Sequence, residues 1–271
     1  MESLSYKNKR VIVSGCFSGM GEATARLLLK LGAEVHGLDH KTCTLDLASF
    51  NQMDLRDPKS IEGCIDRVGG PIHALFNCAG LPQTAPPLDV MKVNFIGTRL
   101  LTDQVLPRMT KGGAIVSVSS NGGLGWRGRM PVLMELLKAE TFQAAVDWCE
   151  ANKDTVREGY ALSKEAIILW TMASSFRLIE RHIRINCTTP GPTQTPMMAE
   201  FEAATPRTVL DAAMRPINRR STPDEQAGPL VFLNSDWASY VNGVSFPVDG
   251  GFMAGLATGQ IDLSSLMRGP A

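Results

Sequence analysis

Short β-branched runs alternate with helix-like segments along almost the whole chain, and this alternation restricts the fold more than any single motif does. The first run, "RVIVSG" at residues 10–15, ends in glycine, as buried strands commonly do. Six more strand-like runs follow, at residues 33–40, 50–55, 72–80, 112–120, 183–192 and 243–251. Between them, apolar residues at helical spacing mark the segments 20–32, 57–70, 90–109 and 160–181.

Strands that alternate with helices predict an α/β fold built on a doubly wound parallel sheet. We expect seven strands, with helices covering both faces of the sheet. The chain has 271 residues, of which 44% are hydrophobic, and this suits a single domain over residues 1–271.

Two segments depart from the regular alternation. Only "KTCTLDLASF" separates the second and third strands, which is too short for a full crossover helix. Residues 121–159 are conversely too long for a plain loop. They contain "MPVLMELLKAETFQAAVDWCEANKD", whose helical periodicity predicts an inserted helical hairpin.

Composition excludes several classes of partner. The 27 basic and 27 acidic residues balance, so we expect neither a nucleic acid nor an anionic membrane surface as a partner. No apolar run approaches the length of a membrane span, and "MESLSYKNKR" does not resemble a signal peptide. The six cysteines are scattered without a C-x-x-C pair, which predicts reduced thiols in a cytoplasmic protein with no metal site.

The first strand leads into a glycine-rich turn, "SGCFSGMG", with glycines at positions 15, 19 and 21. Glycines there let the backbone approach a pyrophosphate whose charge rests on the N-terminus of the following helix. Asp39 ends the second strand, where a carboxylate binds an adenosine ribose and repels a 2′-phosphate. The sequence therefore predicts NAD rather than NADP, although His40 and Lys41 would weaken the discrimination.

Tyr160 and Lys164 lie one helical turn apart at the start of a long apolar segment. A phenol has an ordinary pKa near 10, which is too high for a base at neutral pH. A nearby ammonium favours the phenolate, so we expect Lys164 to lower the pKa of Tyr160 and make it a proton acceptor for an alcohol. The alternative is a tyrosine that merely packs on a lysine stem.

These motifs, together with "NCAG" at residues 77–80, "VSVSS" ending at residue 120 and "PGPTQT" from residue 190, occur in the order of the short-chain dehydrogenase/reductase family. The chain resembles that family over about residues 7–252, which implies a single-domain Rossmann fold. The resemblance implies that Tyr160 is the general acid–base and that Ser120 binds the substrate oxygen. Lys164 would hold the nicotinamide ribose, and Asn94 would anchor a water that relays protons.

The same resemblance implies the cofactor-binding residues. Asp54 would meet the adenine, while Thr193 and Thr195 would hold the carboxamide. The full expected set is Gly15, Ser18, Gly19, Met20, Gly21, Asp39, Asp54, Leu55, Asn77, Ala79, Gly80, Tyr160, Lys164, Pro190, Gly191, Thr193 and Thr195.

The chain departs from the usual family pattern in that Tyr160 follows Ser120 by 40 positions, whereas the two residues are far closer together in most members. With the shortened crossover, this makes it similar to the 3α-hydroxysteroid dehydrogenase/carbonyl reductase branch and to bacterial coniferyl alcohol dehydrogenases. The branch resemblance extends to the ending "NGVSFPVDGG". Family members commonly pair through the tyrosine helix, which an insertion would obstruct. We therefore expect a homodimer joined elsewhere, ahead of a tetramer.

Apolar residues near the expected site indicate a hydrophobic alcohol or ketone: a steroid, a terpenoid or an aromatic alcohol. They lie in the insertion and in an expected substrate loop at residues 192–220: Trp126, Met130, Leu133, Met134, Met197, Met198, Phe201 and Met214. These residues suit a core equally well. A non-catalytic NAD(P)-sensing regulator and a nucleotide-sugar epimerase on a related fold are the alternative functions.

The C-terminal tail, residues 251–271, is unusually apolar for a free end. Two roles fit its composition: packing on its own subunit, and covering the substrate cleft as a lid. The residues concerned are Phe252, Met253, Leu256, Ile261, Leu263, Leu266 and Met267.

Overall fold

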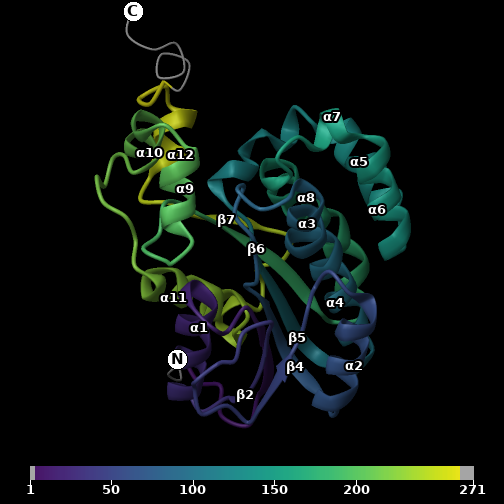
Figure 1. Cartoon of the computed structure of the whole chain (residues 1–271). Helices are drawn as coiled ribbons and strands as arrows, with labels where there is room; N and C mark the ends of the chain where they lie inside the picture. Colours follow the sequence, from purple (N-terminus) through teal and green to yellow (C-terminus); the bar gives the residue numbers. More distant parts are fainter. Residues whose placement is uncertain (1–3, 263–271) are drawn as a thin grey trace, which may run out of the picture.

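The computed structural model describes residues 4–262, and its centre is a seven-stranded sheet in which every neighbouring pair is parallel (Figure 1). The strand order is β3-β2-β1-β4-β5-β6-β7, so the chain winds outward from β1 in both directions. This confirms the predicted doubly wound sheet. The strands are β1 Arg10–Ser14, β2 Glu34–Asp39, β3 Ser49–Gln52, β4 Ile72–Asn77, β5 Met109–Val118, β6 Arg184–Pro190 and β7 Ser245–Val248.

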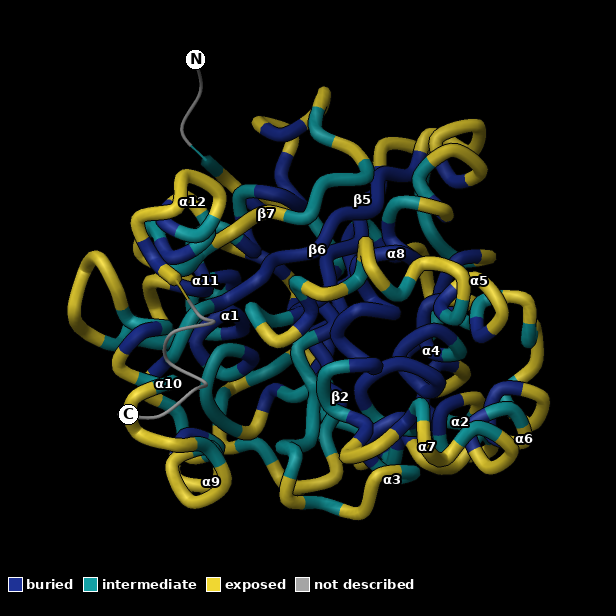
Figure 2. The backbone as a smooth tube through the Cα atoms, turned by 90° about the horizontal axis from the view of Figure 1, so that it is seen from above, coloured by how far each residue is buried: buried dark blue, intermediate teal, exposed yellow. Residues whose placement is uncertain are grey.

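Helices cover both faces of the sheet, and alternate residues of each strand serve the two faces. On one face, Val11 and Val13 of β1 pack in the same cluster as Leu28 of α1 (Gly19–Lys30) and Leu230 of α11 (Pro223–Leu233). On the other face, Ile12 packs with residues of three helices. These helices are α2 (Pro58–Val68), α4 (Gly97–Val105) and α8 (Tyr160–Ile179). Figure 2 shows β5, β6 and α8 as mainly buried tubes at the centre of the molecule.

The helix boundaries follow from local chemistry. Asp57 accepts a hydrogen bond from the Lys59 N–H at the start of α2, and proline occupies the first turn. Thr222 and Glu225 form a capping box at the start of α11. The sequence analysis does not predict α11, although this capping signal is present in the sequence.

The third predicted helix, expected as one element over residues 90–109, is a composite. It consists of α3 (Pro87–Met91), a π-helical turn, η1 (Lys92–Ile96), and then α4, followed by the short 3₁₀ turn η2 (Leu106–Arg108). Single π-helical turns inside α-helices often mark functional positions. This one carries Asn94.

The short connection between β2 and β3 contains no helix, as predicted. Its apolar residues Cys43, Leu45 and Leu47 pack instead against the buried cluster that contains Leu28 of α1. An abbreviated crossover therefore still covers the sheet.

The insertion is helical throughout most of its length. It comprises the 3₁₀ segment η3 (Asn121–Arg127), then α5 (Met130–Lys138), α6 (Phe142–Ala151) and α7 (Lys153–Val156). Leu133 and Leu136 of α5 are fully buried in the same cluster as Ile167 and Trp170 of α8. The hairpin therefore forms part of the core.

Arg99 of α4 binds the inserted hairpin at the end of α5. Its guanidinium donates to the carbonyl oxygen of Ala139, just after α5, and lies 5.2 Å from the centre of the Phe95 ring. Cations are favourable at the C-terminal end of a helix, where carbonyl groups lack partners. A largely buried arginine is thus used to dock the insertion.

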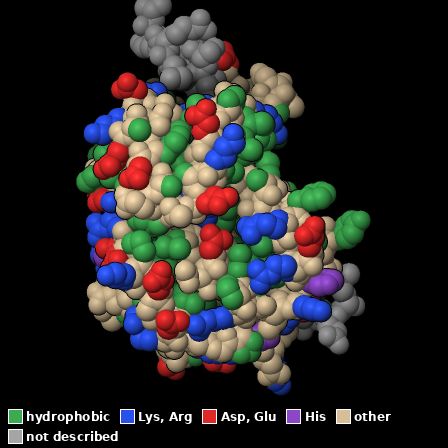
Figure 3. All heavy atoms as spheres, turned by 90° about the vertical axis from the view of Figure 1, so that its right-hand side faces the viewer, with side chains coloured by type: hydrophobic (Ala, Val, Ile, Leu, Met, Phe, Trp, Pro, Cys, Tyr) green, Lys and Arg blue, Asp and Glu red, His purple; other side chains and the backbone are tan. Residues whose placement is uncertain are grey.

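Residues 192–220 contain two short helices, α9 (Met198–Ala204) and α10 (Arg207–Ala213), and the tail begins with α12 (Phe252–Ala257). Figure 1 shows α9, α10 and α12 rising at the same end of the sheet as α5 and α7, on the opposite side of the molecule. On the face shown in Figure 3, basic and acidic side chains are interspersed and do not gather by sign. Within residues 4–262, no helix combines the length and apolarity that a bilayer crossing requires.

We predict that Leu136→Ala lowers the free energy of unfolding by about 2–5 kcal/mol, the usual range for removing a fully buried leucine. Chemical denaturation with urea would measure the change. The matched control is Met134→Ala on the same helix, where the side chain is 41% exposed and the change should stay below about 1 kcal/mol. Equal effects of the two substitutions would contradict a docked hairpin.

Candidate active site

The carboxyl ends of the parallel strands meet at one edge of the sheet, where α/β proteins place their ligands. The glycine-rich turn follows β1, Cys78–Gly80 follow β4, Ser120 follows β5, and Pro190 ends β6. The structure therefore brings four of the predicted motifs together at one edge.

A groove of about 450 Å³ runs along this edge between the turn after β1 and the segments after β2, β3 and β4. Of the expected cofactor residues it is lined by Gly15, Ser18, Gly19, Met20, Asp39, Asp54, Leu55, Ala79, Gly80 and Thr195.

The glycines of the turn permit a backbone approach that no other residue would allow. Gly15 has φ +76°, and a Cβ on it would lie 2.6 Å from the Ala79 nitrogen. A Cβ on Gly21 would lie 2.0 Å from the Gly15 carbonyl oxygen. The turn thus closes against β4 and presents the first N–H groups of α1 to the groove, a cradle that fits a dinucleotide pyrophosphate.

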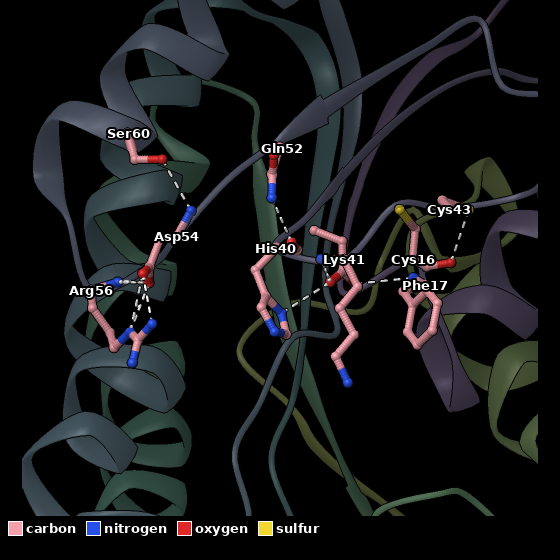
Figure 4. A network of polar contacts seen from close by, with 10 residues as sticks. Cys16, Phe17, His40, Lys41, Cys43, Gln52, Asp54, Arg56 and Ser60 are labelled. Atoms are coloured by element: carbon pink, nitrogen blue, oxygen red, sulfur yellow. Dashed lines mark hydrogen bonds and ion pairs between the residues drawn. The ribbon is translucent and has the colours of Figure 1, made fainter.

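Asp39 stands at the end of β2 with its carboxylate largely buried. Its two oxygens accept hydrogen bonds from the backbone N–H groups of Phe17 and Lys41, each at 3.0 Å (Figure 4). These bonds fix the carboxylate beside the glycine-rich turn. The Lys41 ammonium lies 5.3 Å from the centre of the Phe17 ring, so a cation also stands at this part of the groove.

Asp54 carries an ion pair that the sequence analysis did not predict. Its carboxylate accepts hydrogen bonds from the Arg56 guanidinium at 2.8–3.1 Å, and the same guanidinium reaches Asp89 at 3.3 Å. This pairing lowers the pKa of Asp54. Figure 4 shows Asp54 and Arg56 at the left of the view and His40 and Lys41 near its centre; all four line the groove.

Tyr160 is the first residue of α8 and faces Ser120 across the start of the insertion. Ser120 caps η3 by accepting the Gly122 N–H at 3.0 Å. Desolvation raises the pKa of Tyr160, and a hydrogen bond with Ser120 opposes this rise by favouring the phenolate.

Lys164 is buried one turn below Tyr160. Its ammonium donates to the Val118 carbonyl at 3.0 Å and lies 5.6 Å from the centre of the Tyr160 ring. Burial lowers the pKa of Lys164 to about 8. The ammonium lies close behind Gly80 in the floor of the groove, since a Cβ on that residue would be only 3.7 Å from Nζ.

Our expectation that the pKa of Tyr160 is lowered was wrong for the protein without cofactor. Burial is the largest influence on the tyrosine and acts against the phenolate. The opposing influence comes from Ser120, which follows a different strand. The Tyr-x-x-x-Lys spacing contains no information on burial or on this partner from another strand. The spacing alone therefore predicted the wrong direction for the pKa shift of Tyr160.

Asn94 holds the segment after β4 in place. Its side-chain oxygen accepts the Leu81 N–H at 2.7 Å, and its amide donates to the Leu81 carbonyl at 3.1 Å and to the Ser163 hydroxyl at 3.3 Å. Asn94 therefore connects η1, the groove floor and α8. It touches the same Gly80 position as Lys164 does.

A second cavity, of about 270 Å³, opens above Ser120 and Tyr160, and we call it the substrate cleft. Its apolar wall comes from α9 and α10, where Phe201 meets the Tyr160 ring edge-on at 5.0 Å between ring centres. The lining residues outside the expected catalytic and cofactor-binding sets include Gln83, Asn121, Gly122, Glu158, Met197, Met198, Phe201, Thr205 and Leu210. Of the expected residues it is lined by Met20, Ser120, Tyr160, Pro190, Gly191, Thr193 and Thr195.

Two hydrogen bonds join α9 to the loop after β4. Gln83 donates to the Thr205 hydroxyl at 3.0 Å, and Thr84 donates to Glu200 at 2.8 Å. Glu200 lines the groove and Thr205 lines the cleft. No local sequence signal identifies these pairs, because their members lie more than 100 residues apart.

Some predicted residues lie away from both cavities. Asn77 is buried and donates to Thr102 and Ser117, so its amide ties β4 to β5 and α4. Gly21 lies behind the turn. Only some of the apolar residues that we expected to face the substrate line the cleft. Met197, Met198 and Phe201 do so, whereas Trp126, Met130, Leu133, Met134 and Met214 do not.

Up to residue 262 the tail has a buried side, and the choice between its two expected roles stays a prediction. Phe252 and Ile261 are buried, and no residue from 252 to 262 lines the substrate cleft. The expectations for Leu263, Leu266 and Met267 fall outside the described residues. All six cysteines are free thiols, and residues 4–262 contain no cluster of three or more metal-ligating side chains.

Comparison with known proteins agrees with this geometry. The family profile described as short chain dehydrogenase matches residues 9–132, and that described as enoyl-(acyl carrier protein) reductase matches residues 150–253. The coniferyl-alcohol dehydrogenase of Pseudomonas sp. (strain HR199) is 36% identical over 90% of this chain and 96% of its own length. The 3-alpha-hydroxysteroid dehydrogenase/carbonyl reductase of Comamonas testosteroni is 29% identical over 90% of this chain and 96% of its own.

A solved structure gives the same result in three dimensions. The 3-alpha-hydroxysteroid dehydrogenase from Pseudomonas sp. B-0831, crystallised with NADH, has a TM-score of 0.78 and 29% identity. The match covers 93% of this chain and 99% of that one. The chain therefore belongs to the short-chain dehydrogenase/reductase family of oxidoreductases. Within the family it falls in the branch of the coniferyl-alcohol and 3α-hydroxysteroid dehydrogenases.

Proposed function

We propose that the chain is an NAD-dependent alcohol dehydrogenase/ketone reductase. It transfers a hydride between NAD and a hydrophobic secondary or aryl/allylic alcohol of the steroid, terpenoid or aromatic class. The observation that carries the proposal is that Ser120 and Tyr160 both line the base of an apolar cleft, and that this cleft adjoins the groove lined by the glycine-rich turn and Asp39. The activities named for the relatives support it.

Bound NAD supplies the acceptor for the hydride that leaves the alcohol carbon. Ser120 binds the substrate oxygen, and Tyr160 accepts the hydroxyl proton in oxidation and returns it to the carbonyl oxygen in reduction. Lys164 lies behind Gly80 in the groove floor, where it holds the nicotinamide ribose. Asn94 keeps the segment after β4 against Lys164, and the water relay attributed to it remains a prediction.

The substrate class follows from the cleft. Met197, Met198, Phe201 and Leu210 give it an apolar wall, and methionine side chains adapt to irregular apolar shapes. Glu158 lines the same cavity and is 44% exposed, so a carboxylate stands at the mouth. That carboxylate lies 3.8 Å from the Arg157 guanidinium, and the described cleft lining includes no lysine or arginine that could bind an anion, which favours a neutral alcohol.

We predict that Tyr160→Phe lowers kcat for alcohol oxidation by at least about 10²-fold, because the phenylalanine ring cannot accept the proton. In the wild type, oxidation should rise with pH through the pKa of Tyr160, since only the phenolate is a base. Steady-state kinetics with a panel of hydrophobic alcohols, alongside calorimetric titration with NADH, would measure both effects.

The binding constant for NADH serves as the control and should change by less than about twofold. An active phenylalanine variant would refute the role of Tyr160. If the wild type bound NADH but oxidised no alcohol, the non-catalytic sensing alternative would replace this proposal.

We predict a preference for NAD because the fixed carboxylate of Asp39 stands where it binds ribose hydroxyls and repels a 2′-phosphate. Asp39→Ala should lower the ratio of kcat/KM for NAD to kcat/KM for NADP by at least about 10-fold, because it removes the repulsion between the carboxylate and the 2′-phosphate. Asp46→Ala removes the same charge from an exposed residue outside the groove and should leave the ratio unchanged. Equal use of both cofactors by the wild type would overturn the assignment.

The assembly follows from what the insertion covers. α5 packs on the outer side of α8, so this chain occupies the surface beside the Tyr160 helix with its own hairpin. Large apolar side chains remain exposed at the far end of α8 and near β7: Phe176, Ile179, Tyr240 and Phe246, which we call the edge patch. Ser175 contacts Asn242 and lies against Gly243, which brings the two halves of the patch together.

A second copy of this chain is the occupant we infer for the edge patch. In the described chain β7 ends the sheet, so its outer edge lacks a strand partner. An edge with exposed aromatic side chains becomes self-complementary when a two-fold axis relates two copies. The result is a homodimer joined through β7 and the C-terminal end of α8, so the interface differs from our expectation in that it includes the far end of the tyrosine helix.

We predict that wild-type protein has the molar mass of two chains in light scattering and that the double variant Phe176→Ser/Phe246→Ser has that of one. Met134→Ser removes an apolar residue of the insertion that is 41% exposed, and it should leave the dimer intact. A tetramer, or a dimer that survives the double variant, would show that the edge patch is not the interface.

A further inference from the structure

A buried carboxylate lies beside the catalytic residues without a part in the proposed chemistry. Glu165 follows Lys164 on α8 and is only 3% exposed. Its Oε2 lies 3.2 Å from the Arg129 guanidinium. Burial raises the pKa of Glu165 while the charge of Arg129 opposes the rise. Buried charges are costly, so a retained pair calls for a reason.

Arg129 connects three parts of the structure. It directly precedes α5, near the start of the insertion, and donates to the Thr155 carbonyl at 2.7 Å near the insertion's end. The same side chain reaches Glu165 on α8. The pair therefore fastens both ends of the insertion to the helix that carries Tyr160 and Lys164.

The 3₁₀ segment η3 rests on α8 through glycines. A Cβ on Gly125 would lie 2.7 Å from Oε1 of Glu165, and one on Gly123 would lie 2.9 Å from the Lys164 carbonyl. A Cβ on Gly122 would lie 3.2 Å from the Tyr160 ring. The Glu165 side chain thus lies directly beneath η3, and the spacing between η3 and α8 depends on it.

The position of Ser120 depends in turn on η3. Its hydroxyl accepts the Gly122 N–H at 3.0 Å, so the serine moves with the first turn of that segment. Ser119 adds a second tie to α8 by donating to the Lys164 carbonyl at 2.8 Å. A shift of η3 relative to α8 would therefore change the contact between Ser120 and Tyr160.

We propose that the Glu165–Arg129 ion pair is a positioning device that holds Ser120 against Tyr160. Its catalytic purpose rests on the function proposed above, while its effect on Tyr160 can be measured without substrate. Within residues 4–262, Oε2 of Glu165 has no partner of hydrogen-bond geometry, so its contact with Arg129 is held by opposite charge. A neutral glutamine of the same size consequently cannot replace it.

The test is Glu165→Gln in the full chain, read by NMR of protein labelled with ¹³Cζ-tyrosine at neutral pH. The chain has three tyrosines, and Tyr160→Phe assigns the resonance of interest. Ser120→Ala defines how that resonance moves when the Ser120 contact is lost. Glu165→Gln should move it in the same direction and leave Tyr6 and Tyr240 in place.

A double variant separates positioning from a direct effect of charge. Once Ser120 is alanine, Glu165→Gln should cause no further movement of the Tyr160 resonance, because both changes act through one contact. Independent, additive movements would overturn the proposal, and so would an unmoved resonance. If Glu165→Gln fails to fold, Arg129→Lys, which keeps the charge but loses the planar fork, should give a smaller movement in the same direction.

Kinetics supply the second readout. Glu165→Gln should lower kcat about 10- to 100-fold through misplacement of the serine, with KM for NAD nearly unchanged. Asn234→Ala is the stability control, because its amide donates to the Leu75 carbonyl in the buried region on the other face of the sheet. It should lower the melting temperature without moving kcat or the Tyr160 resonance.

The two proposals fail separately. If the wild type oxidises no alcohol but Glu165→Gln moves the Tyr160 resonance through Ser120, the function is wrong and the positioning stands. If the wild type is active and the resonance does not move, the ion pair has only a structural part.

Discussion

The arrangement of the site depends on the burial of one ammonium group. Lys164 is almost fully removed from solvent, and its charge is compensated by the Val118 carbonyl at 3.0 Å. Burying a charge without a compensating partner costs free energy. The Lys164 ammonium therefore stays buried and charged only while β5 and α8 keep their relative positions. This arrangement places the end of β5 beside the first turn of α8, where Ser120 and Tyr160 meet. The lowered pKa of Lys164, about 8, reflects the cost of this burial.

Much of the fold could be predicted because its signals are local. β-branched runs with glycine endings gave the parallel sheet, and the missing helix between β2 and β3 followed from counting residues. The helices of residues 192–233 were missed, because prolines, glycines and polar residues interrupt their apolar pattern. The π-helical turn that holds Asn94 has no sequence signature that separates it from an ordinary helix.

The location of the site could be predicted from the sequence, but the contacts between its side chains could not. Glycine spacing located the groove, yet the ion pair between Asp54 and Arg56 depends on how β3 ends. Periodicity shows that α5 has an apolar face but not what it faces, so Leu133 entered the core and not the cleft. The direction of the Tyr160 pKa depends on burial, which only the folded chain reveals.

The hydrogen bonds from Gln83 and Thr84 to α9 have a consequence for how such an enzyme can diversify. Met197 lines the groove and the cleft together, and α9 reaches both cavities from one short segment. A change there that admits a bulkier substrate also alters a wall around the dinucleotide. Substrate range and cofactor retention are therefore coupled in this chain, because a substitution in α9 that changes one also changes the other.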